Sequence, residues 1–272
     1  MTFSINLRLT CLLGFAALCP SFGQTPVVSA GGIVNAASFV NGQPVAAGSI
    51  VAIFGQQLAA NLAQADTVPW SNSLGNVTVS FNGTLAPLQF VSAGQINAQV
   101  PWEAFPSGTG TANVVVNNNG ALSTPQSVVV NPIVPGVFQS SGHAIAVNVT
   151  DPTSARYGTL AAPSGSIPGL TTFPAHVNDL LFFYANGLGP VDSPVASGNV
   201  PQSGQVVRTT TIPTVLVANA PAKVLFSGLT PGYPGIYQVN ISVPQVPSGD
   251  AVPLQLQANG FTSPNTTNIA VQ

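Results

Sequence analysis

Two tryptophans and one glutamate have the residue types and spacing best suited to binding a ligand. Trp70 lies in TVPWSNSLG, and Trp102 and Glu103 are consecutive in VPWEAFPSG. Aromatic rings on loops stack on sugar rings, and a carboxylate accepts hydrogen bonds from sugar hydroxyls. Both tryptophans stand beside prolines, outside the alternating segments that predict strands. The three residues predict either a sugar-binding patch or, with the tryptophans as structural residues, rings that fill the end of a β-sandwich or the seam between domains.

Other aromatic residues divide into one further ligand candidate and a set expected in the core. Tyr233, in the segment LTPGYPG, is a second candidate for an exposed ring that binds a ligand. Phe54, Phe90, Tyr184 and Phe226 instead fall inside or at the ends of apolar, strand-like segments. We expect these four side chains to be buried.

Catalytic and metal-binding patterns are missing from the sequence. His143 and His176 are the only histidines, and a zinc site needs three or four ligands. Glu103 is the sole glutamate, the aspartates are scattered, and no G-x-S-x-G motif is present. We therefore expect no catalytic residues, no metal site and no cofactor. A single loop-bound calcium ion, or a hydrolase assembled from the scattered acids, stays open as an alternative.

The composition excludes several classes of protein. The chain has 272 residues, of which 45% are hydrophobic and 4% are charged, and its formal net charge is −2. Surface helices need charged outer faces, and disorder needs low hydrophobicity, so neither class fits. Nucleic-acid binding needs a basic patch, so we expect no nucleic-acid partner. Short strands and turns remain the best fit to this composition.

The first 23 residues have the pattern of a secretory signal peptide. Arg8 precedes an apolar run over residues 9–19, and the small residues Ser21 and Gly23 precede the expected cleavage site. The run is too short to span a membrane, and we expect no membrane span elsewhere. Both cysteines lie within this segment, so the mature chain would be exported without disulfides. We expect it in the secreted fraction or on the outer cell surface.

A phrase that occurs twice indicates an internal repeat. QINAQVPWEAFPSG (95–108) is matched by QVNISVPQVPSG (238–249). In each, apolar and polar residues alternate up to a proline, which is the pattern of a strand with one buried face. An Asn-Gly pair follows each, at 119–120 and 259–260, and this pair is typical of a tight hairpin turn.

The similarity extends upstream of that phrase. Residues 76–90 resemble residues 214–226, and residues 49–58 resemble residues 180–189. The segment LTPGYPG is the main insertion that we identify in the second copy. Repeated short strands separated by turn residues predict an all-β fold of two tandem immunoglobulin-like antiparallel β-sandwiches.

The expected organisation places the signal peptide before two sandwiches. We expect the signal peptide at residues 1–23, the first sandwich at 24–132 and the second at 133–272. The segment NPIVPG is rich in proline and reads as a short, stiff joint between them.

Specific phrases give the sequence a family resemblance. GSIVAIFGQQL, VTVSFNG and VVVNNNG resemble the IPT/TIG variety of immunoglobulin-like domain, and the second half looks like a diverged copy. Over residues 31–272 the chain resembles an uncharacterised family of secreted acidobacterial C-terminal domains, through VNAASF, APLQFVSAGQINAQVPWE, YANGLGPV and GIYQVNISVP. The resemblance implies the tandem fold and carries no catalytic residues.

These observations predict a non-enzymatic structural or interaction module, acting in adhesion, spacing or assembly. Its partner would be an extracellular protein or polysaccharide, and uncharged edge strands leave self-association open. One alternative is a carbohydrate-binding module that uses the loop tryptophans. Another is a domain that sorts attached proteins to the cell surface.

Overall fold

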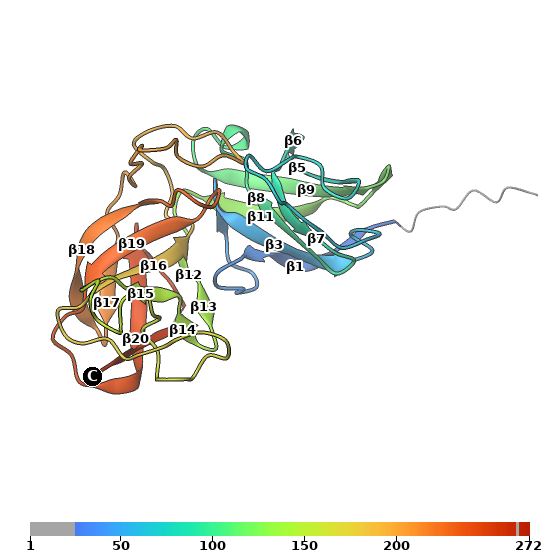
Figure 1. The fold of residues 1–272 in the computed structure, drawn as a ribbon. Helices are drawn as coiled ribbons and strands as arrows, with labels where there is room; N and C mark the ends of the chain where they lie inside the picture. The colour runs from blue at the N-terminus through green and yellow to red at the C-terminus, as the bar shows by residue number, and fades with distance from the viewer. Residues whose placement is uncertain (1–24, 265–266) are drawn as a thin grey trace, which may run out of the picture.

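The fold is built of β-strands, with one short 3-10 helix, in the part of the chain that the structure describes. A computed structural model describes residues 25–264 and 267–272, and the expected signal peptide lies outside them. Its secondary structure consists of β-strands and one short 3-10 helix, η1 (Trp102–Ala104), as Figure 1 shows. Over these ranges no helix has the length and apolar character to cross a membrane. The predicted all-β, immunoglobulin-like fold class is confirmed.

The N-terminal sandwich consists of the first eleven strands. They are β1 (Val27–Asn35), β2 (Val45–Ala46), β3 (Ile50–Gln56), β4 (Ala63–Gln64), β5 (Val77–Phe81), β6 (Thr84–Leu85), β7 (Leu88–Val91), β8 (Gln95–Gln99), β9 (Gly110–Asn118), β10 (Ala121–Leu122) and β11 (Gln126–Asn131). One sheet has the order β1-β3-β8-β7-β4, and the other has the order β2-β11-β9-β5-β6 with β10 beside β9. Ile53, Val79, Ile96 and Val114 are fully buried between the two sheets.

The C-terminal sandwich consists of the remaining strands. They are β12 (Gly136–Val137), β13 (Gln139–Ser140), β14 (His143–Ala144), β15 (Ala146–Asn148), β16 (Leu180–Asn186), β17 (Thr214–Val217), β18 (Ala220–Leu229), β19 (Tyr237–Ser242), β20 (Gly249–Ala258), β21 (Phe261–Thr262) and β22 (Asn268–Val271). They form one continuous sheet along the order β12-β16-β19-β18-β17-β20-β22-β14-β13, with β15 beside β16 and β21 beside β20. Leu181, Phe183, Ile241 and Leu254 lie in its enclosed core.

A single long strand joins the two layers of the C-terminal sandwich. β18 pairs with β17 through Ala220–Ala222 and with β19 through residues 223–229, so it passes from one layer to the other. The N-terminal sandwich divides the same region into the separate strands β6 and β7. Pro87 lies in that break, and a proline cannot donate to a sheet ladder.

The sequence repeat is also a repeat of strand register. β8 pairs with β3 on one side and β7 on the other, as β19 pairs with β16 and β18. In both, a register shift falls one residue before a phenylalanine. This shared register matches residues of the N-terminal sandwich with residues of the C-terminal sandwich. The matched pairs are Ala52 with Phe182, Phe54 with Tyr184, Gln95 with Gln238, Asn97 with Asn240, and Phe90 with Phe226.

The two Asn-Gly turns have the backbone that their sequence predicts. Asn119 has a φ of 50° and Gly120 a φ of 93°, and Asn259 and Gly260 have φ values of 49° and 79°. Positive φ at both central positions is the requirement of the type I′ hairpin turn. These turns connect β9 to β10 and β20 to β21.

The expected burial of four aromatic residues is wrong. Phe54, Phe90, Tyr184 and Phe226 are only partly buried, and they point away from the sandwich cores. The residues of β3 and β16 are apolar almost throughout, so alternation does not reveal which set points inward. In β16 the inward residue is Phe183, beside Tyr184.

The main insertion in the second copy is also different from the one expected. Residues 149–179 separate β15 from β16, whereas only residues 47–49 separate β2 from β3. Asp179 holds this long segment, because its carboxylate accepts hydrogen bonds from Asn148 Nδ2 at 2.8 Å and from the His176 backbone at 2.8 Å. It also forms an ion pair with Arg156. Turns and bends dominate the segment, which gives it no strand periodicity to detect.

Candidate functional site

A buried polar contact joins the two sandwiches. Asn186 at the end of β16 donates from Nδ2 to Asn35 Oδ1 at 2.8 Å and to the Ile50 carbonyl at 2.7 Å. The Ile50 N–H donates to Asn186 Oδ1 at 3.0 Å, and Asn35 Nδ2 donates to the Val134 carbonyl at 2.9 Å. Asn35 is 1% exposed and Asn186 is fully buried. Buried amides with their partners satisfied fix the geometry around them.

A second buried amide extends this contact. Gln99 Nε2 donates to the Gly48 carbonyl at 2.9 Å, and the Gly198 N–H donates to Gln99 Oε1 at 2.6 Å. We call the contact formed by Asn35, Ile50 and Gln99 with Asn186 and Gly198 the seam. A Cβ on Gly198 would lie 2.9 Å from the Trp70 carbonyl oxygen, so the close approach of the backbones requires glycine there.

Trp70 belongs to the seam. Its backbone N–H donates to the Gly198 carbonyl at 2.9 Å, and the residue is 8% exposed. It lies in an apolar cluster with Ile50 and Ala52, against which Ile236 of the C-terminal sandwich also packs. The ring therefore covers β3 and contributes to the interface between the sandwiches.

Trp102 and Glu103 lie next to the seam on η1, where they meet the second sandwich through Ser197. The indole of Trp102 lies against Gly48, where any Cβ would overlap the ring. Its backbone N–H donates to Ser197 Oγ at 2.9 Å. The two carboxylate oxygens of Glu103 accept from the Ser197 N–H at 3.1 Å and from Ser197 Oγ at 2.7 Å.

The electrostatics of Glu103 favour its ionised form. Partial burial raises the pKa of this carboxyl, but the hydrogen bonds from the Ser197 side chain and from backbone N–H groups outweigh it. The net result is a pKa below the usual value for glutamate. The group is therefore a carboxylate acceptor at neutral pH and lacks the raised pKa of a general acid.

A cleft of about 540 Å³ opens beside Trp102 and Glu103. Its opposite wall is the segment 190–196, which contributes Pro190, Val191 and Pro194–Ala196. Tyr237 positions this segment, since its buried hydroxyl donates to the Gly189 carbonyl at 2.5 Å. Glu103 is the only acid in the lining, so the cleft lacks the carboxylate pair of glycoside hydrolysis. It can accept an apolar group that carries one hydrogen-bond donor.

Tyr233 lies apart from this cleft. It is 60% exposed on the loop between β18 and β19 and does not contribute to the lining. Of the four predicted ligand residues, the structure thus places Trp102 and Glu103 together, Trp70 in the seam, and Tyr233 on a separate loop.

The histidines lie on a short strand and in a loop, apart from the cleft. His143 has Nδ1 3.2 Å from the Ser141 carbonyl and Nε2 3.0 Å from the Asp250 carbonyl, so it connects the β13–β14 turn to β20. His176 is exposed and precedes β16. In residues 25–264 and 267–272 no three His, Cys, Asp or Glu side chains gather as metal ligands would.

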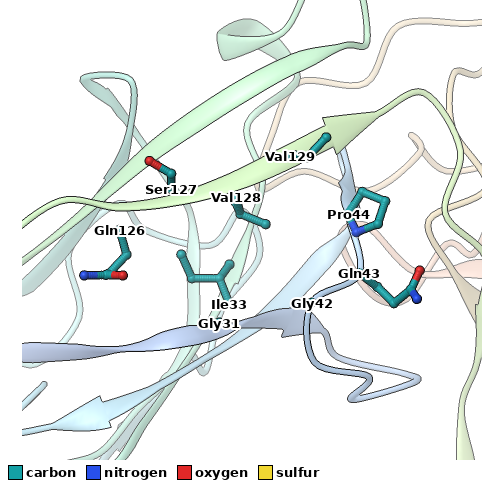
Figure 2. A pocket seen from close by; sticks show the side chains of 9 residues that line it. All are labelled: Gly31, Ile33, Gly42, Gln43, Pro44, Gln126, Ser127, Val128 and Val129. Carbon is teal, nitrogen blue, oxygen red and sulfur yellow. The ribbon is translucent and has the colours of Figure 1, made fainter.

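Another cavity lies at the open side of the N-terminal sandwich. It has a volume of about 290 Å³ between β1 and β11, and Ile33 and Val128 point toward each other across it (Figure 2). β2 pairs with only Val130 and Asn131, at one end of β11. The lining holds no charged side chain, so it offers apolar contacts and uncharged polar groups.

Sequence reasoning missed the residues that build the seam. Asn35 and Asn186 are separated by 151 positions, and although each lies in a phrase that carries the family resemblance, neither phrase indicates a contact between them. Ser197 also lay outside the predicted set, although it contacts both Trp102 and Glu103. The one available signal was that Asn186 ends a strand in the phrase YANGLGPV, where a polar residue terminates a run of apolar ones.

Most of the N-terminal sandwich matches a known domain family. Residues 37–130 match the IPT/TIG domain. The IPT/TIG match begins after β1 and ends within β11, and it supports an immunoglobulin-like fold for these strands. IPT/TIG domains are typically non-enzymatic and mediate protein interactions. No curated protein matches the chain. The resemblance of the whole chain to the acidobacterial family stays a prediction.

Proposed function

We propose that the chain is an exported, non-enzymatic interaction module whose two sandwiches act as one rigid body. The seam is the observation that carries this proposal. Rigid spacing of binding surfaces is useful in adhesion and assembly, because a preorganised surface loses less entropy when it binds.

The seam argues for rigidity through its buried amides. Opening it would remove the acceptors of Asn35 Nδ2 and of the Ile50 N–H and the partners of the Asn186 amide, or would hydrate these groups at the cost of the surrounding apolar contacts. An unsatisfied buried polar group costs about 1–3 kcal/mol. Several such groups are satisfied together, which favours a single orientation of the two sandwiches over a flexible pair.

Export and interaction receive support from the sequence. The signal-peptide pattern predicts secretion, and the low content of charged residues leaves wide surfaces of Asn, Gln, Ser and Thr. The single acid of the cleft and its low pKa favour binding over hydrolysis.

Small-angle X-ray scattering on residues 24–272 tests the rigid-body proposal. We expect the wild type to fit one arrangement of the sandwiches, and the double variant Asn35→Ala, Asn186→Ala to show a larger radius of gyration and a broader distance distribution. Asn240→Ala is the matched control, because it removes an amide from an open face of the second sandwich. Flexible scattering from the wild type would contradict a rigid module.

An assay for new reducing ends on a panel of polysaccharides tests the absence of hydrolysis. We expect no release above the blank. Product formation that Glu103→Gln abolishes would overturn the non-enzymatic assignment.

The cleft supports a second candidate function, saccharide binding at Trp102. A half-buried indole and a carboxylate face the same space of about 540 Å³. This candidate predicts that a saccharide quenches tryptophan emission and that Trp102→Phe removes the response. Trp70→Phe is the control, because Trp70 lies in the seam. An unchanged response in Trp102→Phe would exclude the cleft as the binding site.

A further inference from the structure

Three aromatic rings lie on the outer surface of the sheet formed by β16, β19 and β18. Phe182 and Tyr184 point outward from β16, with ring centroids 5.6 Å apart and an angle of 72° between their planes. Phe226 points outward from β18. Asn240 on β19 stands opposite both Phe182 and Phe226, so the two phenylalanines are in one row, about 10 Å apart across two strand spacings.

Two amides occupy the strand between these rings. Gln238 and Asn240 project from β19 on the same face, and Gln238 Nε2 donates to Asn240 Oδ1 at 2.8 Å. Within the described residues, Gln238 Oε1 and Asn240 Nδ2 have no hydrogen bond to protein. The pair therefore presents one acceptor and one donor group toward solvent. We call the surface of Phe182, Tyr184, Phe226, Gln238 and Asn240 the amide-aromatic face.

Positive charge gathers on this same surface. The described residues contain three cationic side chains, and one of them, Arg156, is paired with Asp179. The Arg208 guanidinium lies 5.1 Å from the centroid of the Phe226 ring. Lys223 is exposed and stands opposite Ser242, which by alternation places it on the outward side with Asn240.

Neither Arg208 nor Lys223 forms an ion pair within the described residues. One acid lies near Arg208, since Asp192 Oδ1 accepts a hydrogen bond from the Arg208 backbone N–H at 3.0 Å. On a chain whose formal net charge is negative, two cations free of ion pairs on one face provide local charge complementarity for an anionic ligand.

The surface is hollowed where these groups converge. A cavity of about 430 Å³ is lined by Arg208, Phe226, Gln238 and Asn240 together with neighbouring loop residues. β18 lies on the side of the C-terminal sandwich away from the N-terminal sandwich in Figure 1, so the N-terminal sandwich does not cover it. A ligand can thus contact a ring, an amide pair and a guanidinium at once.

We propose that the amide-aromatic face binds acidic polysaccharides, which are chains with uronic acid units. The rings stack on sugar faces, the amides bond to hydroxyls, and Arg208 engages a carboxylate through its planar fork of N–H donors. Lys223 meets a second carboxylate as a point charge. This inference rests on the proposed function as an interaction module, and it names the chemistry of the partner.

Sodium polygalacturonate is the probe for the test, and uncharged dextran is the control ligand. Isothermal titration of residues 24–272 is expected to show saturable binding of polygalacturonate that weakens as salt is raised from 50 to 500 mM. Arg208→Gln and Phe226→Ala are each expected to weaken binding by at least about tenfold, since charge-assisted hydrogen bonds and stacked rings dominate such sites. Asn240→Ala is expected to weaken binding by a few fold.

The equivalent N-terminal positions provide matched control variants. Phe90→Ala and Asn97→Ala remove the corresponding ring and amide from β7 and β8. Residues 25–132 contain no lysine or arginine, so both variants are expected to bind polygalacturonate as the wild type does. Circular dichroism melts establish that each variant is folded.

Three outcomes would overturn the inference: no binding of polygalacturonate, equal binding of dextran, or full affinity in folded Arg208→Gln. Each of these leaves the scattering test of the rigid body untouched. Release of reducing ends from polygalacturonate by the wild type would instead contradict the non-enzymatic function, even with binding intact.

Discussion

The two copies of the repeat carry the same amide pair, on a face that is partly covered in the N-terminal sandwich and open in the C-terminal sandwich. On the N-terminal sandwich, Gln95 Nε2 donates to Asn97 Oδ1 at 2.7 Å, as Gln238 does to Asn240. Yet Ala52, beside Asn97 in the register, is fully buried in the cluster that contains Trp70. Its equivalent, Phe182, is partly exposed. One copy covers this face and the other leaves it open.

Side-chain size at one position shows how this difference arises. Ala52 is small enough to lie under the Trp70 ring, whereas a phenylalanine in its place would occupy that space. Along the same face, Gln99 is buried by contacts with Gly48 and Gly198, while its equivalent Ser242 stands opposite Lys223. The two copies therefore share a backbone arrangement but differ in surface. The face of the N-terminal copy contributes to the interface between the sandwiches, and the face of the C-terminal copy is available to a partner.

The largest expected effect is on stability, from removing the ring that covers the N-terminal face. Trp70→Ala is expected to lower the free energy of unfolding by about 3–5 kcal/mol, as large-to-small changes of buried aromatics do. Phe182→Ala on the open face should cost about 1 kcal/mol, because its ring is already partly hydrated. Urea unfolding of both variants measures the difference. Equal losses would mean that the two faces are covered to the same degree.

A smaller loss is expected from the seam amide. Asn186→Leu keeps the side-chain volume but leaves the Ile50 N–H without its acceptor and removes one of two donors from Asn35 Oδ1 and from the Ile50 carbonyl, which should cost about 1–3 kcal/mol. Asn240→Leu on the open face is the matched control, with an expected change within about 0.5 kcal/mol. Guanidinium unfolding measures both. If Asn186→Leu were as stable as the wild type, the seam could not be what fixes the orientation.

The sequence predicted the fold well because the relevant signals are local. Asn119 and Asn259 precede glycines in turns that need positive φ, and the alternation around Asn97 and Asn240 identifies strands from a few residues. Backbone sterics and the two-residue period of a strand act over such short spans.

The seam and the open face depend on signals that are not local. The sequence predicts Phe54 in the core because the residues of β3 are apolar almost throughout, and such a run does not show which side chains point inward. Ser197 and Glu103 are 94 positions apart, and no pattern in either segment predicts their hydrogen bond. Arg208 and Phe226 meet only through the fold, and no spacing pattern in the sequence indicates that contact. Surfaces formed by segments that are distant in the sequence can be identified only from the tertiary structure.

The smallest expected effect concerns the carboxylate at the edge of the seam. Because folding lowers the pKa of Glu103, the ionised group stabilises the folded state above its unfolded pKa of about 4.3, and this contribution is lost as the pH falls through the folded value. Glu103→Gln should therefore lower stability at pH 7 by less than about 1 kcal/mol, because solvent screens this exposed group.

The stability difference between wild type and Glu103→Gln should shrink steadily as the pH is lowered from 5 to 2.5, which urea unfolding at each pH measures. Ser197→Ala removes the hydroxyl donor and keeps the backbone N–H donor, so the effect of Glu103→Gln and its pH dependence should be smaller in that background. A difference that grows toward low pH would show that Ser197 does not stabilise the carboxylate.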